Sequence, residues 1–174
     1  PMMTEPMARL VAEALRDWAA AKSRLHLLDV ACGHGIYGFT LAQQHPHAQV
    51  WSLDWPNVLP ITARNAARFQ VADRVHAIAG DMFTVPLDGP YDLVLVTNVL
   101  HHFSAERARA LVRRLAERLT PGGRIVIVGF TLEEGRDPAL DADSHLFSVL
   151  MLTWTSAGEV HALETYRRML LDEG

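Results

Sequence analysis

The stretch DVACGHGIYGF, residues 29–39, holds the glycines Gly33, Gly35 and Gly38 in the pattern G-x-G-x-x-G. The acidic residue Asp54 lies about 20 residues further on, as in a dinucleotide-binding turn between a strand and a helix. Gly33 and Gly35 permit a tight turn that a ligand can approach closely, whereas Gly38 is expected only to let the helix pack on the sheet. The pattern is weak by itself, so it predicts a ligand-binding turn without deciding the ligand.

Short apolar runs alternate with helical periodicity along the rest of the chain. The predicted strands are 25–31, 49–54, 75–79, 91–97 and 123–130. The predicted helices are 4–22, 35–44, 56–69, a helix from the N-cap Ser104 to the stop signal at 120–123, 146–154 and 159–171, with 133–143 as a loop. This alternation predicts an α/β fold, a Rossmann-like, doubly wound and mostly parallel sheet with helices on both faces.

Polar residues gather where the predicted strands end. They are 29–35, Asp54, Gly80 with Asp81, and 98–102. In doubly wound sheets, ligands bind beyond the carboxyl ends of the strands. The strand ends therefore predict the site.

Asp29 distinguishes between the possible ligands. A carboxylate at the glycine turn opposes a pyrophosphate and favours a cationic ligand such as S-adenosylmethionine (SAM), which has a sulfonium, an ammonium and no phosphate. Asp54 can accept hydrogen bonds from ribose hydroxyls, and Asp81 from an exocyclic amine of a purine that Met82 and Phe83 cover. The simpler alternatives are that Asp29 only binds loop N–H groups and that Asp81 only caps a turn.

Five segments occur in the order and spacing of one known family: LLDVACGHG, VWSLDWPNV, RVHAIAGDMF, YDLVLVTNVLHHF and LTPGGRIVIVG. Together they resemble class I SAM-dependent methyltransferases, and more closely the catalytic domain of bacterial and plant small-molecule O-methyltransferases. The resemblance is strong over residues 25–131 and looser over the tail SHLFSVLMLTWTSAGE. It implies the strand order 3-2-1-4-5, without the family's last strand pair.

The resemblance also implies a domain plan. Residues 1–24 would be a helix and linker to a missing dimerisation domain, and 25–174 a C-terminally truncated SAM-binding catalytic domain. The full-length protein would then be a homodimer that acts on a small-molecule acceptor.

The resemblance assigns roles to individual residues. The implied cofactor-binding residues are Asp29, Gly33 and Gly35 for the methionine end of SAM, Asp54 and Trp55 for the ribose, Asp81, Met82 and Phe83 for the adenine, and Thr97 and Asn98 near the sulfonium. His101 falls where the family places its general base. A neutral imidazole can remove the proton of a hydroxyl nucleophile near neutral pH.

The surroundings of His101 leave several points open. His101 and the adjacent His102 are expected to point in different directions, and either ring could instead only cap or pack against the following helix. The family supports its histidine with later glutamates, for which Glu133, Glu134 and Glu159 are candidates.

Composition narrows the functional class. The net charge is −4, with 16 basic and 20 acidic residues, so nucleic acid is not an expected partner. A single cysteine excludes an internal disulfide framework. No membrane span or signal peptide is visible, so a cytoplasmic location is expected. The histidines do not form two clusters with the spacing of metal ligands, so no metal site is expected.

Transfer of a methyl group to the oxygen of a small aromatic or natural-product acceptor is therefore the leading hypothesis. N- or C-methylation of a small molecule is the alternative within the same class. A nicotinamide-dependent oxidoreductase would leave Asp29, Asp81 and His101 unexplained. A non-catalytic SAM-binding domain is the last alternative.

Overall fold

The computed structural model describes residues 4–132 and 142–171. Its five-stranded sheet has the order β3-β2-β1-β4-β5, which confirms the predicted order. The strands are β1 (Leu25–Val30), β2 (Ala48–Asp54), β3 (Val75–Ala79), β4 (Tyr91–Thr97) and β5 (Leu119–Val128). β2 pairs in parallel with both β1 and β3. The chain forms two compact units, unit 1 from residues 1–95 and 118–126, and unit 2 from residues 96–117 and 127–174.

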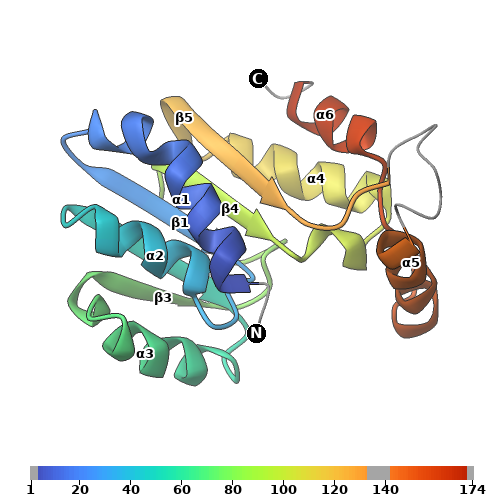
Figure 1. Ribbon diagram of the computed structural model, residues 1–174, viewed down its shortest axis with the longest axis horizontal. Helices are drawn as coiled ribbons and strands as arrows, with labels where there is room; N and C mark the ends of the chain where they lie inside the picture. The colour runs from blue at the N-terminus through green and yellow to red at the C-terminus, as the bar shows by residue number, and fades with distance from the viewer. Residues whose placement is uncertain (1–3, 133–141, 172–174) are drawn as a thin grey trace. The chain divides into compact units, whose positions relative to one another are not determined.

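Unit 1 contains three helices, which lie one after another beside its strands (Figure 1). They are α1 (Thr4–Ala20), α2 (Ile36–Gln44) and α3 (Leu59–Arg68). α1 packs against α2, α2 packs on β1 and β2, and α3 packs on β2 and β3. α1 forms because its apolar residues recur every three or four positions, which places them on one buried face. These buried residues are Ala8, Val11, Ala12, Leu15 and Ala19.

Asp92, near the start of β4, joins this strand to the starts of β1 and β5. Its carboxylate accepts the backbone N–H of His26 at 2.9 Å, the hydroxyl of Thr120 at 3.0 Å and the ammonium of Lys22 at 3.4 Å. Burial by itself raises the pKa of Asp92, but these three bonds outweigh it and leave the pKa below its ordinary value. A carboxylate inside an apolar strand is therefore tolerated because it is fully paired.

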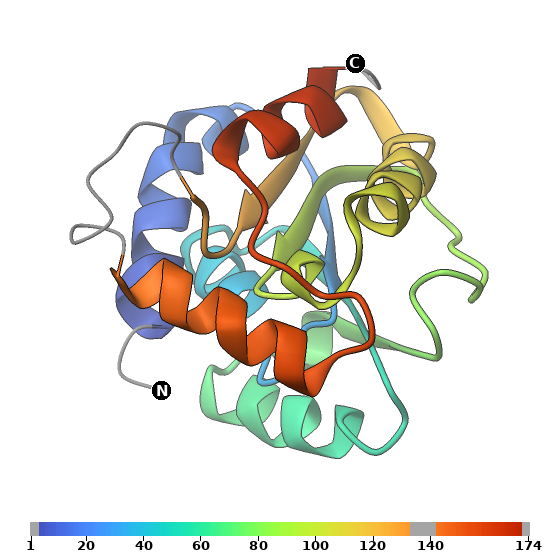
Figure 2. The ribbon, with the colours of Figure 1, turned by 90° about the vertical axis from the view of Figure 1, so that its right-hand side faces the viewer.

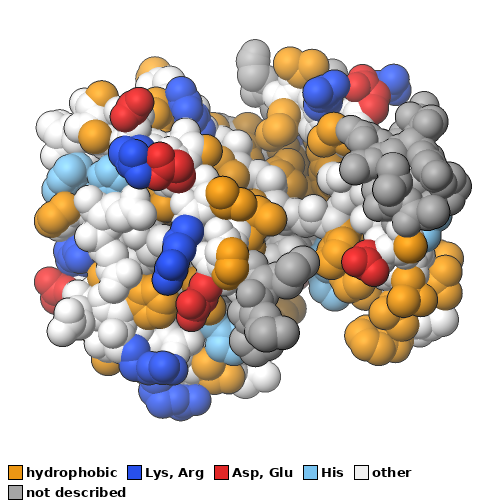
Figure 3. Space-filling model, viewed as in Figure 1, with side chains coloured by type: hydrophobic (Ala, Val, Ile, Leu, Met, Phe, Trp, Pro, Cys, Tyr) orange, Lys and Arg blue, Asp and Glu red, His pale blue; other side chains and the backbone are white. Residues whose placement is uncertain are grey.

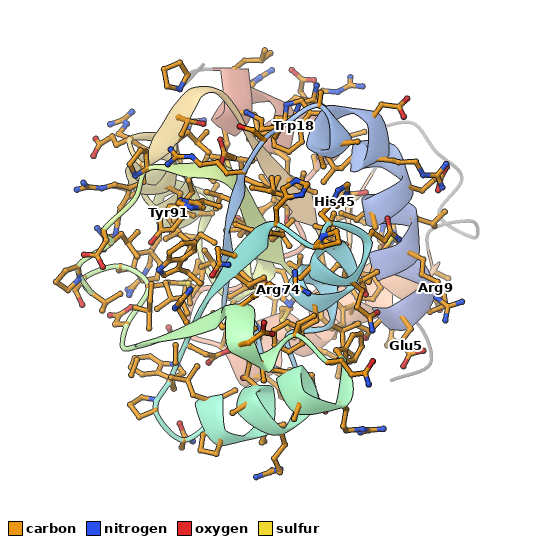
Figure 4. All side chains as sticks on the ribbon, turned by 90° about the vertical axis from the view of Figure 1, so that its left-hand side faces the viewer. Glu5, Arg9, Trp18, His45, Arg74 and Tyr91 are labelled. Carbon is orange, nitrogen blue, oxygen red and sulfur yellow. The ribbon has the colours of Figure 1, made fainter. Side chains whose placement is uncertain are left out.

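Arg74 and Arg124 of unit 1 both have uncharged partners, although Arg74 also lies 3.9 Å from the carboxylate of Asp73. Arg74, in the short helix η1 (Ala72–Arg74), donates to the carbonyls of Ala42, His45 and Ala48 at the end of α2 (Figure 4). A cation at a helix C-terminus complements the helix dipole. The guanidinium of Arg124 lies 5.0 Å from the ring centroid of Trp18.

Several predicted element boundaries were wrong. β5 begins at Leu119 instead of residue 123, and it includes Pro121. A proline is tolerated there because β5 lies at the edge of the sheet, where one side of the strand has no neighbour to bond. α3 begins at Leu59 instead of residue 56, after a turn in which the N–H of Val58 bonds the carbonyl of Trp55.

Unit 2 contains η2 (Leu100–His102), α4 (Ala105–Ala116), α5 (Ala142–Trp154) and α6 (Leu163–Leu171). Ser104 caps α4 as predicted, by accepting the N–H of Arg107 at 3.4 Å. α4 packs against α6. α6 begins four residues later than predicted, because the preceding residues run extended beside Leu132, whose carbonyl accepts the N–H of Leu163.

Apolar side chains gather on the surface of α5 (Figure 3). The exposed ones are Leu146, Val149, Leu152 and Trp154. Among the residues that the structure describes, no helix combines the length and the apolar character needed to cross a membrane.

Candidate functional site

The glycine turn of unit 1 connects β1 to α2 as predicted. Gly33 and Gly35 both have positive φ angles, +52° and +73°. Residues that have a side chain rarely adopt such angles. A Cβ atom at Gly33 would meet nothing within 4 Å, whereas one at Gly35 would collide with the ring of Phe39. Gly35 is therefore required for packing, and the backbone at Gly33 is open to an approaching ligand.

Asp29 lies beneath this turn and is 1% exposed. Its Oδ2 accepts the N–H of Gly38 at 3.2 Å, while its Oδ1 has no hydrogen-bond partner among the described residues. Burial raises the pKa of Asp29 to about 7, with a further contribution from the charge of Asp54 and an opposing one from the Gly38 bond. A buried carboxylate with one unpaired oxygen is poised to accept a donor or a cation.

Gly38 has a more specific role than packing of the helix alone. A Cβ atom at this position would lie 2.9 Å from Oδ2 of Asp29 and 3.1 Å from Cγ1 of Val50. The absence of a side chain at Gly38 thus lets α2 approach β1 closely enough for the N–H of Gly38 to bond Asp29.

Asp54, at the end of β2, ties the second strand to the glycine turn. Its Oδ2 accepts the N–H of Gly33 at 2.8 Å, and its Oδ1 accepts the N–H of Trp55 at 2.7 Å. Each carboxylate oxygen has a second lone pair, so both can still accept hydroxyl groups. Trp55 beside it is exposed.

Asp81, after β3, caps its own turn. Its Oδ1 accepts the N–H of Phe83 at 2.9 Å, and its carbonyl accepts the N–H groups of Thr84 and Val85. The turn is anchored to the neighbouring strand end, because the N–H of Gly80 bonds the carbonyl of Asp54 at 3.0 Å. Met82 and Phe83 are half-buried. The structure thus supports the capping alternative and places Asp81 next to the Asp54 end of β2.

One residue of this region had no signal in the sequence. Thr62, on α3, donates its hydroxyl to the carbonyl of Gly33 at 2.6 Å, and it lies 3.8 Å from the sulfur of Cys32. Burial is the largest cause that raises the pKa of the Cys32 thiol, to about 12. Cys32 is therefore a small buried residue of the turn and not a reactive thiolate.

In unit 2, Thr97 ends β4, and Asn98 comes between this strand and the short helix η2 that contains His101. Thr97 is buried, and Asn98 is exposed with a φ of +52°. The N–H of Asn98 donates to the carbonyl of Val128 at 2.7 Å, which holds this left-handed backbone in place.

His101 is 3% exposed, whereas the adjacent His102 is exposed. The two rings lie close together, with their centroids 4.6 Å apart, so their pointing in different directions stays a prediction. The ring of His101 meets the edge of Phe147, with centroids 4.8 Å apart. Burial lowers the pKa of His101 to about 4, with smaller effects from the charges of His102 and His161. The imidazole of His101 is therefore uncharged near pH 7.

The glutamates predicted to support His101 are only partly described. Glu133 and Glu134 lie outside the described residues. Glu159 contacts His161, with 3.4 Å between Oε1 and Nδ1. The described residues contain no group of three or more potential metal ligands.

Comparison with known proteins places these features in one family. The family model of the O-methyltransferase domain matches residues 2–174. The chain is 29% identical to the tetracenomycin polyketide synthesis 8-O-methyltransferase of Streptomyces glaucescens, covering 91% of this chain and 45% of that protein. It is 31% identical to the L-tyrosine C(3)-methyltransferase of Streptomyces lavendulae, covering 85% of this chain and 40% of that protein.

A solved structure gives the same result. The crystal structure of a candidate O-methyltransferase from Nostoc punctiforme superposes with a TM-score of 0.88 at 32% identity, covering 99% of this chain and 50% of that one. The chain thus spans about half of the length of its relatives or less.

Proposed function

Because the chain belongs to the O-methyltransferase domain family, we propose that it is the SAM-binding catalytic part of an enzyme that methylates an oxygen of a small aromatic acceptor. By their names, the first relative methylates an oxygen in polyketide synthesis, and the second methylates C(3) of L-tyrosine. Transfer to carbon or nitrogen is therefore the alternative within the family.

The unpaired Oδ1 of Asp29 is the observation that best supports this cofactor. A buried carboxylate oxygen without a partner fits the cationic methionine end of SAM and opposes a pyrophosphate. The open side of Gly33 lets a ligand reach the backbone at that point. When bound, SAM supplies an electrophilic methyl group on a sulfonium.

The remaining roles follow the order of the strand ends. Asp54 would accept the ribose hydroxyls with its second lone pairs, and Trp55 would lie beside the sugar. Asp81, Met82 and Phe83 would frame the adenine. Thr97 and Asn98 would line the cofactor near the sulfonium. Such groups accelerate methyl transfer mainly by holding the reactants in line.

His101 would be the general base. Its neutral ring would accept the proton of an acceptor hydroxyl and so make that oxygen a better nucleophile towards the methyl group that SAM supplies when bound. A positioned base of this kind typically contributes about 10²–10⁴-fold to the rate. A cytoplasmic location and a homodimer of a longer protein remain predictions.

Calorimetric titration tests the cofactor directly. S-adenosylhomocysteine, which retains the ammonium group, is expected to bind the chain, and NADH is not expected to bind. Binding of NADH alone would instead support the oxidoreductase hypothesis. A screen of phenolic acceptors with labelled SAM would then show whether the chain transfers a methyl group to oxygen.

A further inference from the structure

A cavity of about 110 Å³ lies between α3 and the strands β2 and β3 of unit 1. α3 packs on both strands, and it lies beside β3 in two views of the ribbon (Figure 1 and Figure 2). Most of the side chains that line the cavity are small. They include Thr62, Ala63 and Ala66 of α3, and Ser52 and Ala77 of the strands.

The cavity exists because the residues that face each other across it are small. Ser52 of β2 and Ala77 of β3 are partners in the strand register, so their side chains lie on the same face of the sheet. Ala63 and Ala66 face them from α3. An engineered cavity of about 150 Å³ binds benzene, so the space beneath α3 is close to the size that one aromatic ring needs.

Ser52 places a hydroxyl group in the wall of this cavity. The residue is fully buried, and its Oγ has no hydrogen-bond partner among the described residues. The thiol of Cys32 lies near this hydroxyl, but a thiol is only a weak donor and acceptor. Because a buried hydroxyl without a partner costs free energy, Ser52 indicates that a molecule in the cavity bonds it.

The lining favours a molecule with an apolar body over water or an ion. A buried water typically makes about three hydrogen bonds. Among the described residues, the lining side chains offer only the hydroxyls of Ser52 and Thr62 and no charge, and Thr62 already donates to the carbonyl of Gly33 at 2.6 Å. Apolar walls with one or two polar groups are typical of sites for small organic molecules.

The cavity is open to the surface on one side. Of the residues that line it, Ala63, Ala72 and Ala77 are exposed, whereas Ser52 and Thr62 are buried. The exposed alanines therefore form the mouth of the cavity, and the two hydroxyl groups lie at its inner end. A small molecule can enter between α3 and β3 with its apolar body against the alanines.

We propose that this cavity is a binding site for a small neutral alcohol with an apolar body, of which phenol is the simplest aromatic example. The hydroxyl of the ligand bonds Oγ of Ser52, and its ring lies against the alanines of α3 and β3. The ligand also contacts Thr62, whose hydroxyl holds the carbonyl of Gly33, so binding is transmitted to the glycine turn. All the lining residues belong to unit 1, and the inference does not depend on the role of His101.

Nuclear magnetic resonance of the whole chain tests this site. ¹H–¹⁵N spectra are recorded during a titration with phenol at pH 7, at which a phenol is neutral. The backbone signals of Ser52, Ala66 and Ala77 should move in a saturable manner, and the signal of Gly33 should follow with the same Kd. Toluene, which has a methyl group in place of the hydroxyl, should bind about 2–10-fold more weakly.

Three variants separate the hydroxyl from the shape of the cavity. S52A removes the hydroxyl only, so it should bind phenol and toluene with equal affinity. A63L places a larger side chain at the exposed mouth and should abolish the binding of both, and leucine is well tolerated in a helix. A67L is the matched control, because Ala67 is exposed on the same helix and does not line the cavity, and it should leave phenol binding unchanged.

The link to the glycine turn has its own variant. T62V removes the hydroxyl that bonds Gly33 and keeps a side chain of similar size in the wall. Phenol should still bind T62V, but the signal of Gly33 should no longer follow. A Gly33 signal that moves in T62V as in the unaltered chain would overturn the link between the cavity and the turn.

The remaining outcomes distinguish this inference from the proposed function. It would be overturned if phenol caused no saturable shift at Ser52, Ala66 and Ala77, or if the unaltered chain bound phenol and toluene equally. Shifts confined to residues around His101 would also overturn it, and would instead assign phenol to the acceptor site. Failure of S-adenosylhomocysteine to bind would contradict the proposed function and leave phenol binding in the cavity as expected.

Discussion

At the scale of single residues, the proposed cofactor role of Asp29 would couple SAM binding to the release of a proton. Its pKa is raised to about 7 in the free protein, so the carboxyl is largely protonated below that pH. A cationic cofactor favours the ionised form, and its binding therefore releases a proton. The affinity for SAM is expected to rise with pH, by up to about tenfold per unit, and to level off above about pH 7. Calorimetry in buffers of different ionisation heat measures both effects.

The variant D29N removes the charge but can still accept the N–H of Gly38. It should weaken SAM binding about 10–100-fold, as expected when a charged hydrogen-bond partner is lost, and it should abolish the pH dependence below pH 7. D73N is the control, because the side chain of Asp73 is 79% exposed. An unchanged affinity in D29N would show that Asp29 serves the turn alone.

The raised pKa of Asp29 also makes the stability of the folded protein depend on pH. A carboxyl whose folded pKa lies above its unfolded value contributes stability that is fully present below about pH 4 and is lost as the pH rises through about 7. His101 acts in the opposite direction, because its lowered pKa contributes stability above about pH 6.5 that is lost as the pH falls through about 4.

The low pKa of His101 predicts the acid limb of the activity. With saturating SAM, kcat/KM for the acceptor should fall as the pH is lowered through about 4, and not through the ordinary pKa of 6.5. The reason is that the protonated ring cannot accept a proton. H101A should lower kcat about 10²–10⁴-fold and leave the cofactor affinity unchanged. An acid limb at pH 6.5 that persists in H101A would assign the limb to another group.

At the scale of elements, the packing of α2 on β1 depends on Gly38. The variant G38A places a methyl group against Asp29 and Val50, so it should cost about 1–3 kcal/mol through overpacking. For a chain of this size, the loss corresponds to a Tm lower by very roughly 2–12 °C. G129A is the matched control, since a Cβ there meets nothing within 4 Å. Thermal unfolding followed by circular dichroism measures both variants.

The bounds of the helices and strands differ in how well they could be predicted from the sequence. β3 and β4 were predicted with their correct bounds, because apolar runs and turn residues are local signals. The start of α6 was wrong because it depends on hydrogen bonds to Leu132, about 30 residues away in the chain. Thr62 was missed for the same reason, because the carbonyl that its hydroxyl bonds belongs to Gly33, 29 residues earlier in the chain.

At the scale of the whole molecule, the ligand should stabilise the chain. A ligand that binds only the folded state adds about 2.7 kcal/mol at 100 times its Kd, which raises the Tm by roughly 5–11 °C for this length. S-adenosylhomocysteine should produce this shift in the unaltered chain and a smaller one in D29N at the same concentration. Differential scanning fluorimetry measures the shift, and an equal shift with NADH would contradict the proposed cofactor.

The boundaries between the two units fall inside β4 and β5, and this affects the order in which the protein can be completed during synthesis. Unit 1 holds the glycine turn, but it also needs residues 118–126, which the ribosome adds only after residues 96–117 of unit 2. Unit 1, and the glycine turn within it, is therefore complete only after residue 126 has been added. Neither unit is one continuous piece of chain, so neither can be obtained alone by a single cut.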